Sequence, residues 1–295
     1  MRTVRTVLDV RAALAPARGA GRSIGLVPTM GAFHEGHLSL MRRARAENDA
    51  VVVSLFVNPS QFGDGEDLAT YPRDDERDAE LAAAEGADLL FVPPPDEVYP
   101  EGFDTVVHVG AITDVLCGEP ARRGAAHFDG VTTVVAKLLN MVGPHVAYFG
   151  QKDAQQAIVV KKLVRDLDMP VTIEVCPTVR ERNGLALSSR NAYLTPAERK
   201  RATALNRALD AAQAAVAAGH GDAATVLETA DAELAAAGID PEYVELRDAN
   251  DLSAVDSVGE STLLAIAAPV GRARLIDNRI LAAHGPARPP TKGRR

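Results

Sequence analysis

One stretch of the chain predicts the fold around it: Pro28-Thr29-Met30-Gly31-Ala32-Phe33-His34-Glu35-Gly36-His37. The apolar run 24–27 precedes it, a run with helical periodicity covers 38–48, and a second apolar run covers 50–57. This order is typical of a βαβ unit, which requires a parallel sheet. Because ligands of such sheets bind beyond the carboxyl ends of the strands, we expect the quoted stretch to lie at a binding site.

The turn in this stretch carries two histidines, His34 and His37, in the spacing H-x-G-H. A turn that begins a helix also presents backbone N–H groups without intrahelical partners, and these groups favour anions. We therefore predict a phosphate site, although the stretch matches neither the Walker loop nor G-x-G-x-x-G. Two alternatives are open for the histidines, a metal site or an ordinary surface, and no neighbouring Cys/His cluster completes a metal site. The glycines have the alternative of serving only the turn.

Composition limits the class of protein. The chain has 295 residues, enough for two domains, and its 46% hydrophobic and 24% charged residues are ordinary for a globular enzyme. The net charge of −8 argues against a general nucleic-acid binder. The sequence shows no apolar run near the length of a membrane span, no signal-peptide h-region, and only two cysteines, Cys117 and Cys176. We predict a cytoplasmic protein without a nucleic-acid or membrane partner.

Further apolar runs extend the predicted sheet over 87–92, 145–149 and 171–175. We predict a short helix at Leu8–Leu14, an irregular stretch over 93–128 and an apolar helix at Gly130–Val142. Long irregular stretches of this kind are often functional. The first domain is predicted to cover residues 1–190.

The composition changes at 195–198, where Thr, Pro and Glu stand at the N-cap, first and third positions of a predicted helix. The elements expected after it are one long alanine-rich helix to about residue 218, a second helix to about 237, and strands at 242–247, 262–268 and 272–276. We predict a smaller α+β domain over 191–283 and a disordered tail over 284–295.

Polar side chains follow other predicted strands as well. Asn58 and Gln61 come after the second strand, and Lys152 and Gln156 come after the strand that ends at Phe149. Neutral amides bind carboxylates or hydroxyls without adding charge, and a lysine beside a helix N-terminus suits a phosphate. The alternatives are turn chemistry for Asn58 and a solvated helix surface for Lys152 and Gln156.

A third polar segment, 184–191, holds two hydroxyls and a guanidinium on a loop that follows a glycine, namely Ser188, Ser189 and Arg190. A mobile phosphate clamp needs these groups. Each of them is also an ordinary loop residue, so the prediction gains its weight from the other two segments expected at the same edge of the sheet.

Together these motifs resemble the pantoate–β-alanine ligase family. The matching segments, in family order, are 28–37, Val57-Asn58-Pro59-Ser60-Gln61-Phe62, Tyr71-Pro72-Arg73, His127-Phe128 with Gly130-Val131, Phe149-Gly150-Gln151-Lys152-Asp153 with Gln155-Gln156, and Pro177-Thr178-Val179-Arg180 through Leu187-Ser188-Ser189-Arg190-Asn191. H-x-G-H alone belongs to a wider nucleotidyltransferase superfamily, whereas the combination is specific. The resemblance implies a Rossmann-like parallel-sheet nucleotidyltransferase domain followed by the smaller α+β domain, and a homodimer.

The resemblance also implies an ATP-dependent ligase that uses Mg²⁺ and joins D-pantoate to β-alanine through a pantoyl adenylate, releasing pyrophosphate and AMP. It places ATP at Met30, Gly31, Ala32, Phe33, His34, Glu35, Gly36, His37, Gly150, Gln151, Lys152, Asp153, Val179, Leu187, Ser188, Ser189 and Arg190. It places pantoate at Gln61 and Gln156, with Gln61 also near β-alanine. It gives the catalytic role to His37, and we add His34, Lys152 and Arg190 as groups able to neutralise phosphate charge. Metal ligands are not identified.

One departure from the family pattern concerns an arginine three residues before the His-Phe pair. That position is Gly124 here, and Arg122 and Arg123 stand just before it. Two other functions stay open at this stage. One is a nucleotidyltransferase whose product keeps the nucleotide, and the other is a nucleotide-binding regulator without turnover, which has no need for Gln61, Gln156 and the Ser-Ser-Arg segment together.

Overall fold

The computed structural model describes residues 1–63 and 67–282, which form two compact units. The first unit comprises Met1–Arg180 with Ala186–Ser189, and the second comprises Glu181–Leu185 with, among the described residues, 190–282. The predicted tail at 284–295 lies outside the described residues. The assignment of ATP and pantoate to the first domain stays a prediction.

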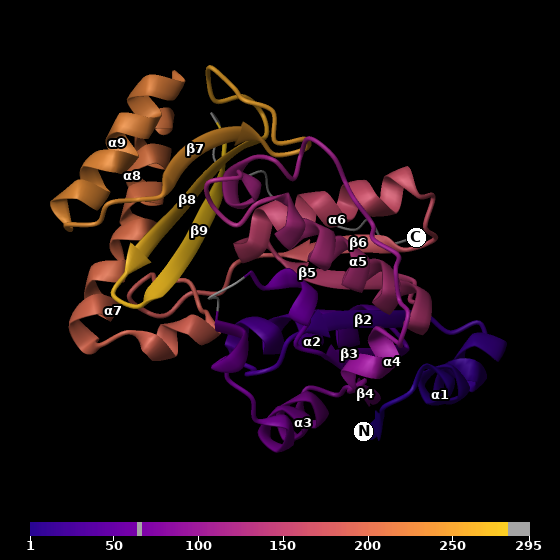
Figure 1. Ribbon diagram of the computed structural model, residues 1–295. Coiled ribbons are helices and arrows are strands. Elements are labelled where there is room, and N and C mark those ends of the chain that lie inside the picture. Colours follow the sequence, from indigo (N-terminus) through magenta and orange to yellow (C-terminus); the bar gives the residue numbers. More distant parts are fainter. Residues whose placement is uncertain (64–66, 283–295) are drawn as a thin grey trace. The chain divides into compact units, whose positions relative to one another are not determined.

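The first unit contains a parallel sheet, as predicted, and this sheet has six strands (Figure 1). Its strands are β1 (Arg2–Val4), β2 (Ile24–Thr29), β3 (Ala50–Leu55), β4 (Leu89–Phe91), β5 (Val146–Gly150) and β6 (Thr172–Cys176). Runs such as β3, in which every residue is buried, are expected where helices cover both faces of a sheet. Strand β1 was not predicted, because three residues show no periodicity.

The helices of this unit are α1 (Val7–Gly19), α2 (Glu35–Glu47), α3 (Asp75–Ala84), α4 (Pro95–Val98), α5 (Ala125–Val142) and α6 (Ala154–Asp166), with short 3₁₀ turns η1 (Pro59–Gln61), η2 (Asp67–Ala69), η3 (Leu116–Gly118) and η4 (Gln151–Asp153). Helix α1 is longer than the predicted 8–14. Helix α5 begins at Ala125 rather than Gly130, so His127 lies on its first turn and not in an irregular stretch.

The strand order β1-β4-β3-β2-β5-β6 reverses between β2 and β5. From β2 the chain continues to β3 and β4 on one side, and from β5 it continues to β6 on the other. In open α/β sheets such a switch point, at the carboxyl ends of the strands, is where ligands bind. The turn that follows β2 is the stretch singled out in the sequence.

Apolar contacts anchor this turn to the core. Phe33 is 1% exposed and belongs to one buried cluster with Leu40 and Met41 of α2 and Val53 of β3. Burial of a phenylalanine side chain contributes about 2 kcal/mol. The core thus fixes the residue that directly precedes His34.

The second unit holds an antiparallel sheet of β7 (Tyr243–Asp248), β8 (Thr262–Val270) and β9 (Ala273–Leu281), with helices α7 (Pro196–Ala202), α8 (Ala204–Ala217) and α9 (Ala223–Ala236). The capping box of Thr195 and Glu198 is present, as predicted. The prediction of a single long helix was wrong, because the helix is interrupted at Thr203. The Thr203 hydroxyl donates to the Lys200 carbonyl at 2.7 Å, and such local bonds compete with the helical pattern. The predicted third strand was too short, since β9 reaches Leu281.

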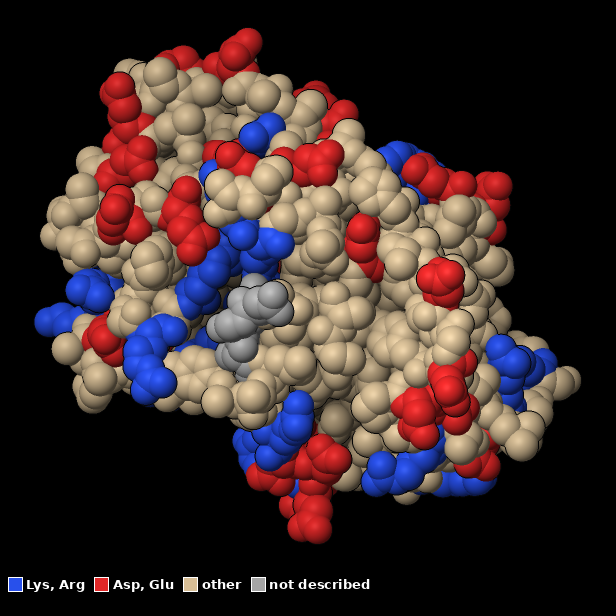
Figure 2. Space-filling model, viewed as in Figure 1, with Lys and Arg blue, Asp and Glu red and all other residues tan. Residues whose placement is uncertain are grey.

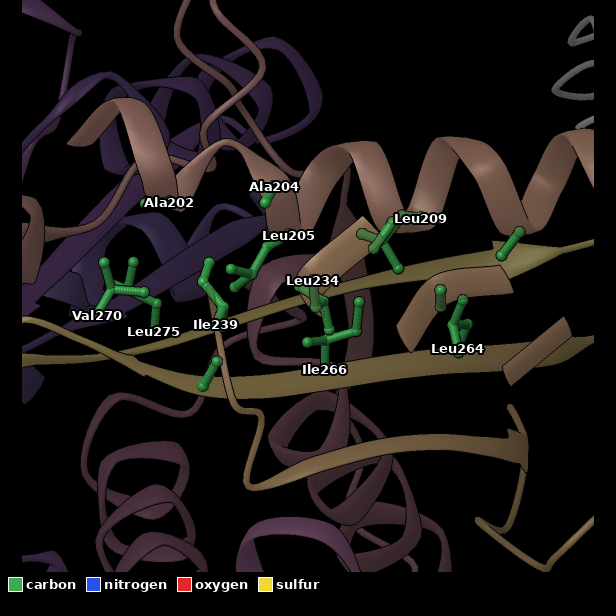
Figure 3. Packing of buried hydrophobic residues seen from close by; sticks show 14 of the residues in the cluster. Ala202, Ala204, Leu205, Leu209, Leu234, Ile239, Leu264, Ile266, Val270 and Leu275 are labelled. Carbon is green, nitrogen blue, oxygen red and sulfur yellow. The ribbon is translucent and has the colours of Figure 1, made fainter. Parts of the chain in front are cut away.

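Figure 3 shows how this unit packs: Leu205 and Leu209 of α8 point toward the sheet, where Leu264 and Ile266 of β8 meet them. Alanines at 204, 208 and 212 are fully buried, and their four-residue spacing places them on one face of α8. Small side chains on that face let the helix approach its neighbours closely, which accounts for a core almost without aromatic residues.

Acidic and basic side chains lie beside one another at several places on the face shown in Figure 2. Ion pairs of this kind include Arg45 with Asp88 at 2.8 Å and Arg42 with Glu85 at 2.7 Å. Each exposed pair contributes at most about 1 kcal/mol. Within 1–63 and 67–282, helices long and apolar enough to cross a bilayer are absent.

Candidate active site

The sheet brings the predicted site segments to one edge of the first unit. Strands β2 and β5 are parallel neighbours, with Gly25 opposite Val146 and Leu26 opposite Ala147. Strand β3 pairs with β2 along its other side. The turn 30–34, the segment 58–61 and the segment 150–153 therefore all follow the carboxyl ends of adjacent strands.

His34 and His37 bind the backbone at the start of α2 in a reciprocal way. The Gly36 N–H donates to His34 Nδ1 at 3.1 Å, and the His34 N–H donates to His37 Nδ1 at 3.4 Å. A ring nitrogen that accepts carries no proton, so each neutral imidazole carries its proton on Nε2. The two rings lie 4.2 Å apart between centroids. The site thus presents two Nε2–H donors side by side.

Both histidines are neutral at pH 7. Burial, together with the smaller effect of the Lys152 charge, lowers the pKa of His34 to about 4. Burial likewise lowers the pKa of His37 to about 3, with smaller effects from His34 and Lys152. The Lys152 ammonium is therefore close enough to act on both rings. Among the described residues, clusters of three or more His, Cys, Asp or Glu able to hold a metal are absent.

The backbone of the turn is held by a residue that the sequence analysis did not identify. Ala32 and Phe33 donate their N–H groups to Oδ2 and Oδ1 of Asp78, at 2.6 and 2.7 Å. Gly31 and Ala32 have φ values of 90° and 53°, and an alanine in this region costs about 1–2 kcal/mol. The expectation of unpaired backbone donors at this turn was wrong for these two groups, because a carboxylate of the protein itself binds them.

Asn58 and Gln61 have different environments. Asn58 is 1% exposed, and its Nδ2 donates to Gln61 Oε1 and to the Gly130 carbonyl, both at 3.1 Å. The Tyr99 hydroxyl donates to Asn58 Oδ1 at 2.7 Å. Asn58 is thus satisfied inside the protein and orients the half-buried Gln61, whose Nε2 also donates to Met30 Sδ at 3.2 Å.

Helix α5 supports the same segment from the other side. His127 Nδ1–H donates to the Gln61 carbonyl at 2.6 Å, and Arg123 Nη1 donates to His127 Nε2 at 3.3 Å. A Cβ on Gly130 would lie only 2.3 Å from the Ser60 carbonyl oxygen, so a glycine is required there. Arg122 instead binds Glu119 at 2.9 Å. Of the two shifted arginines, Arg123 contacts the Gln61 network.

The segment after β5 carries two adjacent glutamines, Gln155 and Gln156, whose side-chain amides have different surroundings. Gln155 is buried, and its side chain accepts from the Cys117 N–H at 3.0 Å and donates to the Val115 carbonyl at 2.6 Å. Gln156 is half-buried, and no group of the described residues hydrogen-bonds its side chain. Lys152 Nζ lies 3.5 Å from Asp153 Oδ1. Adjacent residues on a helix point in different directions, so Gln155 points into the core and Gln156 does not.

The third predicted segment begins beyond β6. The Leu187 N–H donates to the Val179 carbonyl at 3.0 Å, and Ser189 Oγ lies 3.4 Å from the hydroxyl of Tyr71. Ser188 is half-buried beside it. Arg190 belongs to the second unit. It lies in the 3₁₀ turn η5 (Ser189–Tyr193). Its part in the site stays a prediction.

Comparisons with known proteins agree on one family. The family model described as pantoate-beta-alanine ligase matches residues 2–280. The chain is 53% identical to the pantothenate synthetase of Moorella thermoacetica over 284 residues, which cover 95% of this chain and 99% of that protein. It is also 53% identical to that of Roseiflexus castenholzii over 287 residues, covering 96% and 100%.

Solved structures agree with this result. The pantothenate synthetase of Thermus thermophilus matches with a TM-score of 0.90 and 46% identity, covering 96% of this chain and 100% of that one. The pantoate-beta-alanine ligase of Francisella tularensis, complexed with beta-gamma ATP and beta-alanine, matches with a TM-score of 0.77 and 33% identity, covering 95% and 97%. From the matched length, the identity and the shared fold, the chain belongs to the pantoate–β-alanine ligase family.

Proposed function

We propose that this protein condenses D-pantoate with β-alanine to give pantothenate in two steps, with cleavage of ATP to AMP and pyrophosphate. A pantoate carboxylate oxygen attacks the α-phosphorus of ATP, and the bond to the leaving pyrophosphate breaks. The β-alanine nitrogen then attacks the acyl carbon of the pantoyl adenylate, and the bond to AMP breaks. The family membership of the whole chain supports the substrates, and the site geometry supports the way in which they react.

The observation that carries the proposal is the pair of neutral histidines beside Lys152 at the sheet's switch point. Pantoate is already ionised at pH 7, so the first step needs no general base. It needs alignment of the carboxylate with the α-phosphate and stabilisation of charge on the leaving group. Two Nε2–H donors and one ammonium supply hydrogen bonds and charge for this purpose.

The remaining ATP contacts are assigned by position. Ser188 and Ser189 offer hydroxyls, and Arg190 offers a guanidinium that matches phosphate oxygens. A Cβ added to Gly150 would have no other atom within 4 Å, so the backbone there is open to close approach. The Leu187 N–H donates to the Val179 carbonyl, which holds the two backbone segments side by side. We expect both residues to contact ATP through their backbone.

Gln61 and Gln156 are the proposed pantoate ligands, with Gln61 also near β-alanine. Gln61 is fixed through Asn58 and Met30 and keeps a second N–H on its Nε2, while the Gln156 amide is uncommitted within the described residues. Neutral amides bind the pantoate hydroxyls and carboxylate without competing with the phosphate-binding cations.

The donors near the site fit a magnesium ion that is held mainly by ATP. Mg²⁺ in such enzymes typically uses substrate phosphates, waters and one or two carboxylates. Asp153, whose carboxylate side chain is 48% exposed beside Lys152, is the residue that suits this role. When bound, the metal would neutralise phosphate charge. The predicted homodimer and cytoplasmic location stay predictions.

The decisive experiment follows pyrophosphate release from purified protein with Mg²⁺ and ATP, with and without D-pantoate, before β-alanine is added. We expect pantoate-dependent pyrophosphate first, and AMP with pantothenate only after β-alanine. ATP binding without pantoate-dependent pyrophosphate would reject the substrate and favour a regulator. A product that retains the nucleotide after β-alanine is added would favour a nucleotidyltransferase.

A further inference from the structure

A buried carboxylate lies behind the histidine turn. Asp78, on the first turn of α3, is 0% exposed, although its neighbours Asp74 and Asp75 are exposed. Both of its oxygens face the turn after β2 and accept from Ala32 and Phe33. Asp78 is therefore shielded from any substrate, yet it binds the segment that carries the two histidines.

The turn that Asp78 binds has a backbone conformation that its sequence does not favour. Gly31 and Ala32 are consecutive residues with positive φ, and alanine rarely adopts this conformation. Such a conformation persists where surrounding groups fix it. The two hydrogen bonds from Ala32 and Phe33 to one carboxylate are charge-assisted. The Ala32 N–H directly follows Gly31 and the Phe33 N–H directly follows Ala32, so each bond fixes the peptide group after one of the two positive-φ residues.

The position of the turn determines the position of the histidines. Phe33 contacts the His37 ring at 5.5 Å between centroids, and His34 is the next residue in the chain. His34 and His37 are then tied to each other through the start of α2. A shift of the Ala32–Phe33 backbone is transmitted directly to both imidazoles.

We propose that Asp78 is a positioning residue, whose carboxylate holds the turn Gly31–Phe33 so that the Nε2–H groups of His34 and His37 face ATP. The carboxylate occupies the place at this turn where an anionic ligand would bind, so the phosphates are left to the side chains. The kinetic part of this inference rests on the proposed function, whereas its structural part does not.

The test compares Asp78→Asn with Asp75→Asn, an exposed aspartate of the same helix, in the full-length protein. An asparagine offers one acceptor and turns an N–H₂ group toward a backbone N–H, so the turn must shift. We expect kcat for pantoate-dependent pyrophosphate release to fall about 10²-fold, with KM for ATP changing less than about threefold. The Asp75→Asn variant should keep the wild-type values. An unchanged kcat per folded molecule in Asp78→Asn would overturn the proposal.

A second measurement needs no substrate and separates this inference from the proposed function. In wild-type protein, NMR should show the His34 and His37 rings as Nε2–H tautomers that do not titrate near pH 6.5, and the Ala32 and Phe33 amides as strongly protected from exchange. In Asp78→Asn, we expect both histidines to titrate closer to pH 6.5. If that variant does not fold, rapid exchange of these two amides in the wild type would by itself refute the role of Asp78.

Discussion

The two turns at the switch point use their backbone in opposite ways. After β2, the N–H groups of Ala32 and Phe33 bind Asp78, and that of Gly36 binds His34. After β5, Gly150 has open space around it, and helix α6 begins without a side-chain cap. The comparison teaches that the first turn is fixed by the protein's own groups and offers side chains, whereas the second has open space beside its backbone at Gly150.

The largest effect is expected from the first turn. His37→Ala removes one Nε2–H donor and the acceptor of the His34 N–H. We expect pantoate-dependent pyrophosphate release to slow by about 10³-fold, because donors aimed at the developing charge contribute on this scale. Stopped-flow detection of pyrophosphate, with circular dichroism to verify folding, measures the effect.

The matched control for this variant is His108→Ala. His108 has a side chain that is 56% exposed and pairs with Asp129 in the same unit. Its removal should change the rate less than about twofold. A rate in His37→Ala equal to that of the control would remove the histidine from the mechanism and with it the contrast between the turns.

Lys152, in the second turn, should contribute the next largest effect. Lys152→Ala removes a charge that adds to the effect of burial on both histidines, so the pKa of His34 should rise above about 4, while burial, the larger cause, still holds it below its ordinary value. We expect kcat/KM for ATP to fall about 10²-fold. Lys162→Ala, which affects a lysine paired with Asp166 on α6, serves as control. Histidine titrations by NMR that coincide in the two variants would contradict the electrostatic link between the turns.

The half-buried histidines His34 and His37 also make stability depend on pH. Their folded pKa values of about 4 and 3 lie below the unfolded value of 6.5, so the unfolded chain binds protons that the folded protein does not. This contribution to the free energy of unfolding is therefore complete above about pH 6.5 and is lost as the pH falls toward 4. We expect a loss of about 2–3 kcal/mol between about pH 6.5 and 5. Urea unfolding should show a shallower pH dependence in His34→Gln; an equal slope would argue that the rings are solvated.

Much of the fold could be predicted from local features of the sequence. Apolar runs flanked by turns and helical periodicity identified β2, α2, β3 and β5, because these features are determined by neighbouring residues. The strand order was not accessible in this way, since runs of similar apolar character do not encode which strands become neighbours. Strand β1 was missed for a different reason, because three residues are too few to show a periodicity.

The candidate site divides along the same line. His34, Gln61 and Lys152 follow strand ends in the sequence, so their common edge was predictable. Asp78 was not, because Asp74, Asp75 and Asp78 look alike until α3 is rotated onto the core, where Asp78 and Ala82 share the buried face. Nothing in the residue type distinguishes a buried carboxylate that serves the protein's own backbone from one that faces solvent.

Two glycine substitutions test how the turns differ in backbone freedom. Gly31 has φ 90°, and a Cβ there would lie 3.1 Å from Asp78 Oδ2, so Gly31→Ala should lower the free energy of unfolding by about 1–2 kcal/mol. Gly150 has φ −89° and an open surrounding, so Gly150→Ala should change stability by less than about 0.5 kcal/mol. We expect the latter to raise KM for ATP about tenfold instead. Equal thermal unfolding of both variants would show that the first turn is not constrained.

The smallest expected effects come from the adjacent glutamines of α6. Gln156→Ala removes an amide to which no group in 1–63 or 67–282 hydrogen-bonds, so KM for pantoate should rise about tenfold, the equivalent of one hydrogen bond, with stability unchanged. Gln155→Ala removes the side-chain acceptor of the Cys117 N–H and one of the two donors to the Val115 carbonyl, which keeps the Gly118 N–H at 2.9 Å, so it should cost about 1–2 kcal/mol of stability with KM unchanged. Steady-state kinetics and urea unfolding of both variants separate the two outcomes. If KM rose in Gln155→Ala and not in Gln156→Ala, the assignment of the two amides would be reversed, and the second turn would meet its substrate through the loop that Gln155 holds.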